Sequence, residues 1–203
     1  AGETPWRVAE PVAAAPRAAE ARSASAPLLV AEHLTKEFGV GRGLGRSTQR
    51  VTAVDDVSFA IAHARTLGLV GESGSGKSTI ARLLTRLMEP TGGSILFEGR
   101  DITTLSSAEL RPVRSRLQMI FQDPYASLNP RMTVFETVAE AYRFHHPGAA
   151  SADVTAKVEA TLARVGLGAR ADVDRYPHEF SGGQRQRIGI ARALIVDPSF
   201  IIA

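Results

Sequence analysis

Residues 71–79 read Gly71-Glu72-Ser73-Gly74-Ser75-Gly76-Lys77-Ser78-Thr79. This string matches the pattern G-x-x-x-x-G-K-[ST] at every fixed position. It follows a short apolar run, Thr66–Val70, and precedes apolar residues at helical spacing: Ile80, Leu83, Leu84, Leu87 and Met88. We therefore expect a strand buried on both faces of a parallel sheet, a glycine-rich turn, and a helix that stops at Glu89–Gly93.

The chemistry of this turn suits a polyphosphate. Glycines at 71, 74 and 76 let the backbone curl with its N–H groups pointing inward, and the helix N-terminus adds a partial positive charge. Lys77 would reach the β- and γ-phosphates, and Ser78 would offer its hydroxyl to Mg²⁺, which prefers oxygen ligands. A glycine-rich turn that binds nothing is the alternative. The predicted phosphate-binding residues are Gly71, Ser73, Gly74, Ser75, Gly76, Lys77, Ser78 and Thr79.

Composition limits the remaining classes. The chain has 203 residues, 44% apolar and 22% charged, which is ordinary for one globular domain. Its net charge of +3 is too small an excess to indicate a dedicated nucleic-acid binder. The absence of cysteine excludes disulfides and thiolate metal sites. No apolar run approaches the ~18 residues that a membrane-spanning helix needs.

The chain divides by composition near residue 27. Residues 1–27 are rich in Ala and Pro, which predicts a disordered tail or an interdomain linker, and residues 28–203 form the folded domain. Within that domain Gly39–Arg50 is expected to be a loop. The expected strands are Leu28–Leu34, Val51–Ile61, Ser94–Glu98 and Leu117–Phe121, and the expected helices are Thr133–Phe144, Ser151–Val165 and a short one opened by Ser106-x-x-Glu109.

A second glycine-containing segment leads into a helix near the end of the chain. It reads Phe180-Ser181-Gly182-Gly183-Gln184-Arg185-Gln186-Arg187. Ser181 is placed to cap the helix, which stops at Asp197-Pro198. A loop that feeds a helix N-terminus predicts a second anion site, whereas a solvated helix face is the default interpretation of Arg185 and Arg187.

These segments, in this order, resemble the ATP-binding domain of ABC transporters. Phe180–Gln184 is similar to the family's signature Leu-Ser-Gly-Gly-Gln, with Phe in place of Leu. Gln122 matches the family's glutamine-loop position, and Phe38 falls where the family has an aromatic residue that stacks on adenine. The resemblance runs from about Leu28 to Ala203. It implies an α/β fold: a P-loop NTPase core with a mixed or parallel sheet, an N-terminal antiparallel β-subdomain, and an inserted helical subdomain at about 123–180.

The strings around these motifs resemble one group within that family. Phe121–Arg131 and Arg175–Arg187 are similar to the oligopeptide and dipeptide importers, with their nickel and glutathione relatives. Pro124–Arg131 favours the second of the paired ATPases in such systems. The resemblance implies coupling of ATP binding and hydrolysis to uptake of peptides or similar small solutes.

The resemblance also implies partners and residue roles. Two such domains would sandwich ATP and Mg²⁺ between the phosphate loop of one and Ser181, Gly182, Gly183 and Gln184 of the other. Lys77, Gln122 and Ser181 (in trans) would be catalytic, with Ser78 and Gln122 as metal ligands. The helical subdomain would dock on transmembrane permease subunits at the cytoplasmic face of the membrane, served by a solute-binding protein and without nucleic acid. Tyr125 and Leu128 are candidates for that contact, with burial inside the subdomain equally expected.

The chain departs from the family pattern at its end. It stops at Ala203, before the expected Mg²⁺-binding Asp, the Glu that polarises water, the dimer-contact loop and the switch His. We therefore expect a fragment, with the C-terminal part of the core missing, that binds ATP and hydrolyses it negligibly. The alternatives are a soluble non-transport ABC ATPase acting on nucleic acid or ribosomes, and a regulatory protein that binds ATP without turnover.

Overall fold

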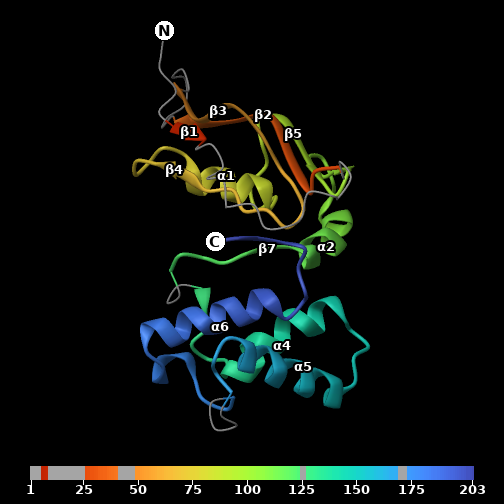
Figure 1. Ribbon diagram of the computed structural model, residues 1–203. Helices are drawn as coiled ribbons and strands as arrows, with labels where there is room; N and C mark the ends of the chain where they lie inside the picture. The colour runs from red at the N-terminus through yellow and green to blue at the C-terminus, as the bar shows by residue number, and fades with distance from the viewer. Residues whose placement is uncertain (1–5, 9–25, 41–48, 124–126, 169–172) are drawn as a thin grey trace, which may run out of the picture. The chain divides into compact units, whose positions relative to one another are not determined.

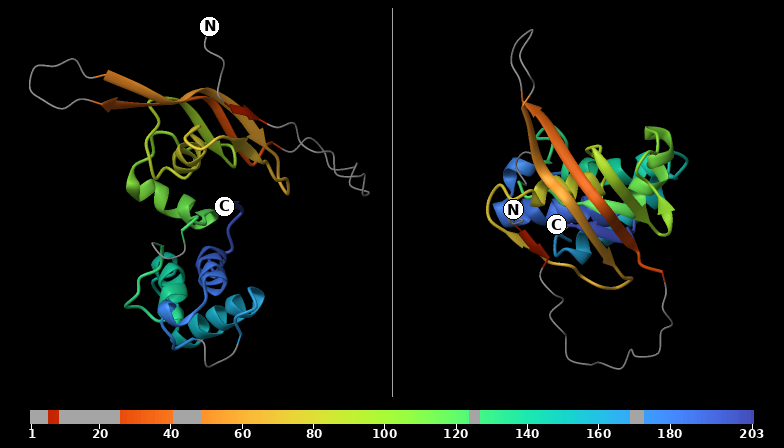
Figure 2. Two further views of the ribbon diagram at one scale, coloured as in Figure 1. Left: turned by 90° about the vertical axis from the view of Figure 1, so that its left-hand side faces the viewer. Right: turned by 90° about the horizontal axis from the view of Figure 1, so that it is seen from above.

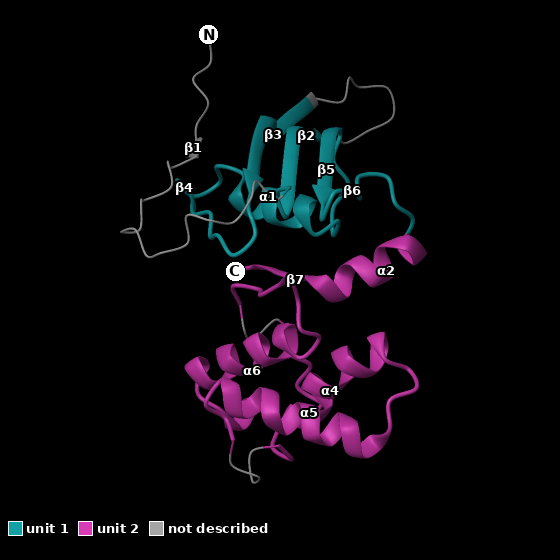
Figure 3. Ribbon diagram, turned by 45° about the vertical axis from the view of Figure 1, so that its right-hand side comes forward, with its two compact units in different colours: residues 1–106 teal, residues 107–203 magenta. Residues whose placement is uncertain are grey.

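The computed structural model describes residues 6–8, 26–40, 49–123, 127–168 and 173–203. The chain divides into two compact units, Ala1–Ser106 and Ser107–Ala203, which Figure 3 shows in different colours. Unit 1 contains β1 (Trp6–Val8), β2 (Leu29–Val40), β3 (Gln49–Ile61), β4 (Leu69–Gly71), α1 (Lys77–Leu84), β5 (Gly92–Phe97) and β6 (Arg100–Asp101). Unit 2 contains α2 (Ser107–Arg116), β7 (Leu117–Met119), α4 (Val134–His145), α5 (Ser151–Arg164), the 3₁₀ helix η2 (Pro177–Glu179), α6 (Gly182–Leu194) and β8 (Phe200–Ile202).

Unit 1 is built around an antiparallel sheet in the order β3-β2-β5-β6. Helix α1 lies against one face of this sheet (Figure 1). The helix buries Ile80, Leu83 and Leu84, whose spacing of three and one puts them on a single stripe. They join fully buried strand residues such as Leu29 and Ile95. The predicted antiparallel β-subdomain is therefore present.

The β2–β3 hairpin is longer than the sequence predicts, as Figure 2 shows. Strand β2 continues past Leu34 to Val40, and β3 begins at Gln49, so both ends of the expected Gly39–Arg50 loop belong to strands. Cross-strand pairing explains the extension, because Phe38 lies opposite Val51 and Arg50 donates to the Glu37 carboxylate at 3.1 Å. The rest of that loop, residues 41–48, lies outside the described part of the chain.

Strand β4 contradicts the prediction of a strand buried on both faces. It covers only Leu69–Gly71, and Val70 is 65% exposed. Its pairing partner among the described residues is β1, which runs antiparallel to it. A strand is covered on both faces only when strands flank it and layers pack above and below, and the described residues of unit 1 do not give β4 that cover. The same pairing shows that Trp6–Val8, inside the segment expected to be a tail, form a strand.

Helix α1 also ends earlier than its apolar pattern suggests. The N–H of Leu87 donates to the Arg82 carbonyl at 3.0 Å, and the N–H of Arg86 donates to the Leu83 carbonyl at 2.9 Å. These two bonds make a Schellman motif, with Arg86 in the left-handed position at φ 52°. Leu87 consequently leaves the stripe and is 54% exposed.

Unit 2 is a helical unit with its own core. Helices α4, α5 and α6 pack together, and their shared core includes Val138, Val158, Leu162, Ile188 and Phe180. The two predicted long helices are confirmed within one residue at each end. Thr133 caps α4 through a reciprocal bond with Glu136.

Two short strands complete unit 2. The predicted strand at Leu117–Phe121 is shorter, as β7, and pairs in parallel with β8. The parallel strand pair in unit 2 and the antiparallel pairs in unit 1 together match the mixed sheet expected of the α/β class.

Helix α2 begins directly after Ser106, at the place where the predicted capping box would open it. None of the described helices is both long enough and apolar enough to span a bilayer.

Candidate nucleotide-binding site

The phosphate loop, Gly71–Thr79, forms the turn between β4 and α1 as predicted. Gly76 is the N-cap of α1, with φ 93°, and no side chain caps the helix. The first N–H groups of a helix have no acceptor within the helix, so those at the start of α1 remain available to a ligand. Gly74, at φ 84°, makes the other left-handed turn in the loop. An uncapped helix N-terminus behind two such turns is a suitable anion site.

Gly76 is fixed by its surroundings as well as by its dihedral angle. A Cβ at this position would lie 2.4 Å from the carbonyl oxygen of Ala53 on β3. The loop therefore rests directly on the backbone of β3, and only glycine permits that approach. At Gly74 a Cβ would meet nothing within 4 Å, so space is open there.

Lys77 is folded back over the loop. Its ammonium donates to the carbonyl oxygens of Gly71 at 2.7 Å and Glu72 at 2.5 Å, and to Ser75 Oγ at 3.1 Å. The positive charge is therefore held at the loop, where a polyphosphate would lie. Because these acceptors are neutral, a phosphate oxygen would form a stronger, charge-assisted bond with the same ammonium.

Two hydroxyl groups follow Lys77 in the first turn of α1. Ser78 is exposed and Thr79 is half-buried, whereas Ile80 is buried and its N–H donates to the Gly76 carbonyl at 2.9 Å. An exposed serine beside a phosphate site can offer Mg²⁺ the oxygen ligand that it prefers. Ser78 therefore fits the predicted metal-ligand role.

Phe38 presents an aromatic ring on the β2–β3 hairpin. It is 37% exposed, and its strand partner Val51 is 48% exposed. The Lys36 ammonium lies 5.3 Å from the ring centroid and donates to the Glu89 carbonyl at 2.8 Å. An accessible ring of this kind can stack on a base, and the adenine-stacking role of Phe38 stays a prediction.

The signature segment, Phe180–Gln184, opens α6. Ser181 is the N-cap: its Oγ accepts from the Gln184 N–H at 3.4 Å, and its own N–H donates to Gln184 Oε1 at 2.9 Å. The predicted capping role of Ser181 is confirmed. Ser181, Gly182, Gly183 and Gln184 are all exposed, whereas Phe180 is buried in the helical core. The segment thus has an apolar anchor followed by an open, hydroxyl-bearing helix N-terminus, which is a second candidate anion site.

Gln122 lies in unit 2, just after β7, and is exposed. Residues 124–126, including Tyr125, fall outside the described part of the chain. Leu128 is 5% exposed and belongs to the helical core, so the alternative of burial holds for it. Arg192 of α6 donates to the Ser127 carbonyl at 2.5 Å and thereby ties this segment to the signature helix.

Sequence reasoning missed two arginines that hold the turn before the signature. Arg185 is half-buried and donates to carbonyl oxygens of η2, so the default interpretation as a solvated helix face is wrong for this residue. Arg175 donates to the Glu179 carbonyl at 2.6 Å and lies over the Phe180 ring at 4.3 Å. The available signal was weak: an arginine four residues after a helix cap can reach back to the preceding carbonyls.

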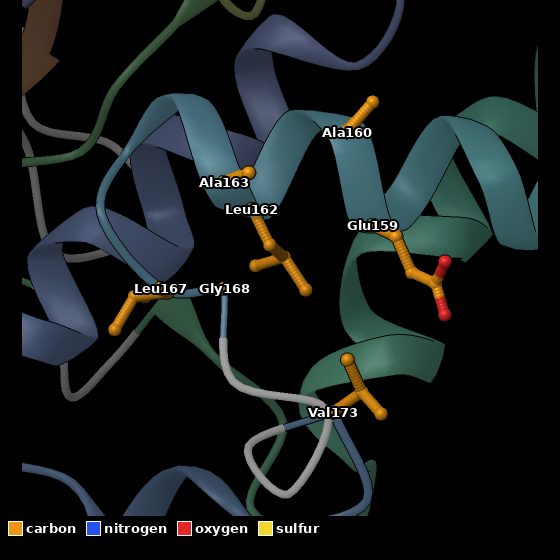
Figure 4. Close-up of a pocket in the computed structure, with 7 residues that line it drawn as sticks. All are labelled: Glu159, Ala160, Leu162, Ala163, Leu167, Gly168 and Val173. Carbon is orange, nitrogen blue, oxygen red and sulfur yellow. The ribbon is translucent and has the colours of Figure 1, made fainter.

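The cavity in Figure 4 is separate from these residues. It has a volume of about 550 Å³ and is lined from α5 and the segment after it by Glu159, Ala160, Leu162, Ala163, Leu167, Gly168 and Val173. None of the predicted nucleotide-binding residues contributes to this lining.

A glycine-rich loop between a strand and an uncapped helix, with a lysine at the first helical position, defines a P-loop nucleotide-binding protein. The profile of the family described as "ABC transporter" matches residues 54–203, and the chain belongs to that family. The predicted fold class is confirmed by solved ABC cassettes, given below.

Curated relatives agree with the group suggested by the sequence. The chain is 51% identical over 177 residues to the oligopeptide transport ATP-binding protein OppF of Bacillus subtilis, covering 87% of this chain and 56% of that protein. It is also 51% identical over 180 residues to the glutathione import ATP-binding protein GsiA of Shigella dysenteriae, covering 87% of this chain and 28% of that protein. The chain therefore spans about half the length of OppF and less of GsiA.

Solved structures give the same fold. The dimeric ATP-binding cassette MJ0796, in a post-hydrolysis state bound to ADP and Pi, superposes with a TM-score of 0.74 at 28% identity, covering 85% of this chain and 72% of that one. CbiO1 from Clostridium perfringens has a TM-score of 0.67 at 23% identity, covering 86% and 64%, and supports the fold alone.

Proposed function

We propose that this chain is the ATP-binding part of an ABC importer that couples ATP binding and hydrolysis to uptake of peptides or similar small solutes. The observation that carries the proposal is the Lys77 ammonium held over the phosphate loop at the uncapped start of α1. The importer class is supported by relatives described as oligopeptide transport and glutathione import ATP-binding proteins.

In this proposal the phosphate loop binds the triphosphate and Mg²⁺. The N–H groups of the loop and the Lys77 ammonium neutralise the β- and γ-phosphates, while Ser78 and Gln122 ligate the metal. Phe38 stacks on adenine. The bound metal supplies charge neutralisation at the transferring phosphoryl group.

A second ABC ATPase domain completes the site. Ser181 and the amides that follow it would contact the γ-phosphate bound by the other domain, so ATP favours the closed dimer over the open one. The dimeric MJ0796 cassette supports this arrangement. The helical unit would dock on permease subunits at the cytoplasmic face of the membrane, and a solute-binding protein would deliver the solute.

The test compares two lysine variants of the full-length protein that carries these residues. Lys77→Ala should abolish Mg·ATP binding, ATP hydrolysis and peptide-dependent growth of cells that need this uptake system. Lys157→Ala, which removes an ion pair with Asp197 inside unit 2, should retain all three. Unchanged Mg·ATP affinity in Lys77→Ala would overturn the proposed site, and normal uptake without the gene would overturn the importer role.

A further inference from the structure

The turn in front of the signature segment is held by guanidinium groups on two sides. Arg185 Nε donates to the Pro177 carbonyl at 2.7 Å, and its Nη2 donates to the His178 carbonyl at 3.1 Å. Arg175 Nη2 donates to the next carbonyl, that of Glu179, at 2.6 Å. Three consecutive carbonyl oxygens of η2 therefore accept charge-assisted bonds, which are about twice as strong as neutral ones.

Arg185 connects this turn to the helix that Ser181 caps. Its backbone N–H donates to the Ser181 carbonyl at 2.9 Å, while its side chain reaches back past the cap to η2. The Glu179 carboxylate closes the other end of the turn by accepting the Tyr176 N–H at 2.6 Å. Ser181 thus lies between two segments that one residue fixes together, and Ser181 itself is exposed.

We propose that Arg185 is a positioning residue for Ser181, holding its hydroxyl and the following amides in the orientation that a γ-phosphate on a second ABC ATPase domain requires. The inference rests on the proposed function, because Ser181 acts there in trans. A planar guanidinium bridges two carbonyls at a fixed spacing, whereas an ammonium is a single point donor. Removing the bridge frees the turn and the serine with it, while the phosphate loop in unit 1 keeps its own contacts.

The chain offers a matched control on the same helix. Arg187 also donates from its side chain to a backbone carbonyl, that of Val165 at 3.4 Å. This contact lies on the segment after α5 and not on η2. Arg187→Ala therefore removes an arginine and a carbonyl contact from α6 without releasing the turn before Ser181.

The experiment is a double-mutant cycle in the full-length protein, assembled with its partner subunits. Arg185→Ala should lower kcat for ATP hydrolysis about ten- to hundredfold, the range expected for misplacement of a contacting group, and leave KM for Mg·ATP unchanged. Arg185→Lys should fall between Arg185→Ala and wild type, and Arg187→Ala should match wild type. In a Ser181→Ala background, Arg185→Ala should cause a smaller loss than it does in wild type, because the hydroxyl contact is already gone and only the amides remain to be misplaced.

The outcomes separate this inference from the proposed function. A wild-type protein that neither binds nor hydrolyses ATP would overturn the proposed function. If wild type hydrolyses ATP but Arg185→Ala keeps its kcat, or if the losses from Ser181→Ala and Arg185→Ala multiply in full, the positioning role is wrong. Should Arg185→Ala fail to fold, the same cycle with Arg185→Lys decides the matter by the same two criteria.

Discussion

At the scale of single residues, the phosphate loop shows that two glycines in one motif are needed for different reasons. Gly74 and Gly76 both have positive φ. Of the two, only Gly76 lies against other backbone, because a Cβ added there would meet the carbonyl oxygen of Ala53. The sequence pattern fixes Gly76 and leaves the residue at 74 variable. The packing of Gly76 on β3 is a physical reason for that difference.

Alanine substitutions separate the two effects. Gly74→Ala should lower the free energy of unfolding by about 1–2 kcal/mol, the cost of a left-handed conformation for a residue with a Cβ. Gly76→Ala should cost clearly more, because the added Cβ would also lie 2.4 Å from a backbone carbonyl that cannot rotate away. Urea unfolding of both variants measures the difference, and equal losses would contradict the packing argument.

At the scale of elements, helix α1 shows where sequence reasoning stops. Its start follows from Gly76-Lys77 and its buried stripe from the spacing of Ile80, Leu83 and Leu84, and both were predictable. Its end was not, because Leu87 and Met88 continue the apolar period and no glycine marks the stop. Arg86 ends the helix instead, and its Nε donates to the Ile102 carbonyl at 3.0 Å, a contact between residues far apart in the chain.

Arg86 gives a prediction about this helix end. Arg86→Ala should lower the free energy of unfolding, since it loses the bond to Ile102 and keeps a Cβ at φ 52°. Arg86→Gly loses the same bond but removes the left-handed strain, so it should be more stable than Arg86→Ala by about 1 kcal/mol. Chemical denaturation of the two variants provides the comparison, and the reverse order would refute the Schellman assignment.

The signature helix illustrates the same limit at the candidate site. The cap by Ser181 and the exposed glycines were predictable from local chemistry, because a cap bonds to residues of its own turn. The contacts of Arg185 on α6 and of Arg175 before η2 were not, because exposed arginine side chains usually face solvent. Likewise the exposure of β4 depends on which strands pair with it, and an apolar run does not carry that information.

At the scale of the whole molecule, each unit has its own core, and the two candidate anion sites are divided between them. The phosphate loop belongs to unit 1, whereas the signature segment and Gln122 belong to unit 2. The sequence order predicted both sites, since each is a local strand–turn–helix or loop–helix segment. It did not predict the division at Ser106, which depends on the packing of α4, α5 and α6 into a separate core.

This division predicts how a bound nucleotide stabilises the protein. Mg·ATP at about 100 times its Kd adds about 2.7 kcal/mol to the free energy of unfolding of the part of the chain that unfolds together with the binding site. If unit 1, residues 1–106, unfolds by itself, that corresponds to a rise in its Tm of roughly 10–20 °C, since each kcal/mol is worth about 4–8 °C in a unit of this size. Because the loop belongs to unit 1 and Gln122 is the one proposed contact from unit 2 of the same chain, the stabilisation should fall mainly on opening reactions that unfold unit 1.

Hydrogen exchange in the full-length protein, measured below the concentration at which it dimerises, locates the effect. Amides of α1 and of the β2–β3 hairpin should gain protection with Mg·ATP, whereas those of α5 in unit 2 should not. Lys77→Ala should remove the gain, and Lys157→Ala should preserve it. Equal protection of α1 and α5 in wild type would contradict this prediction and would mean that the two units open as one cooperative body.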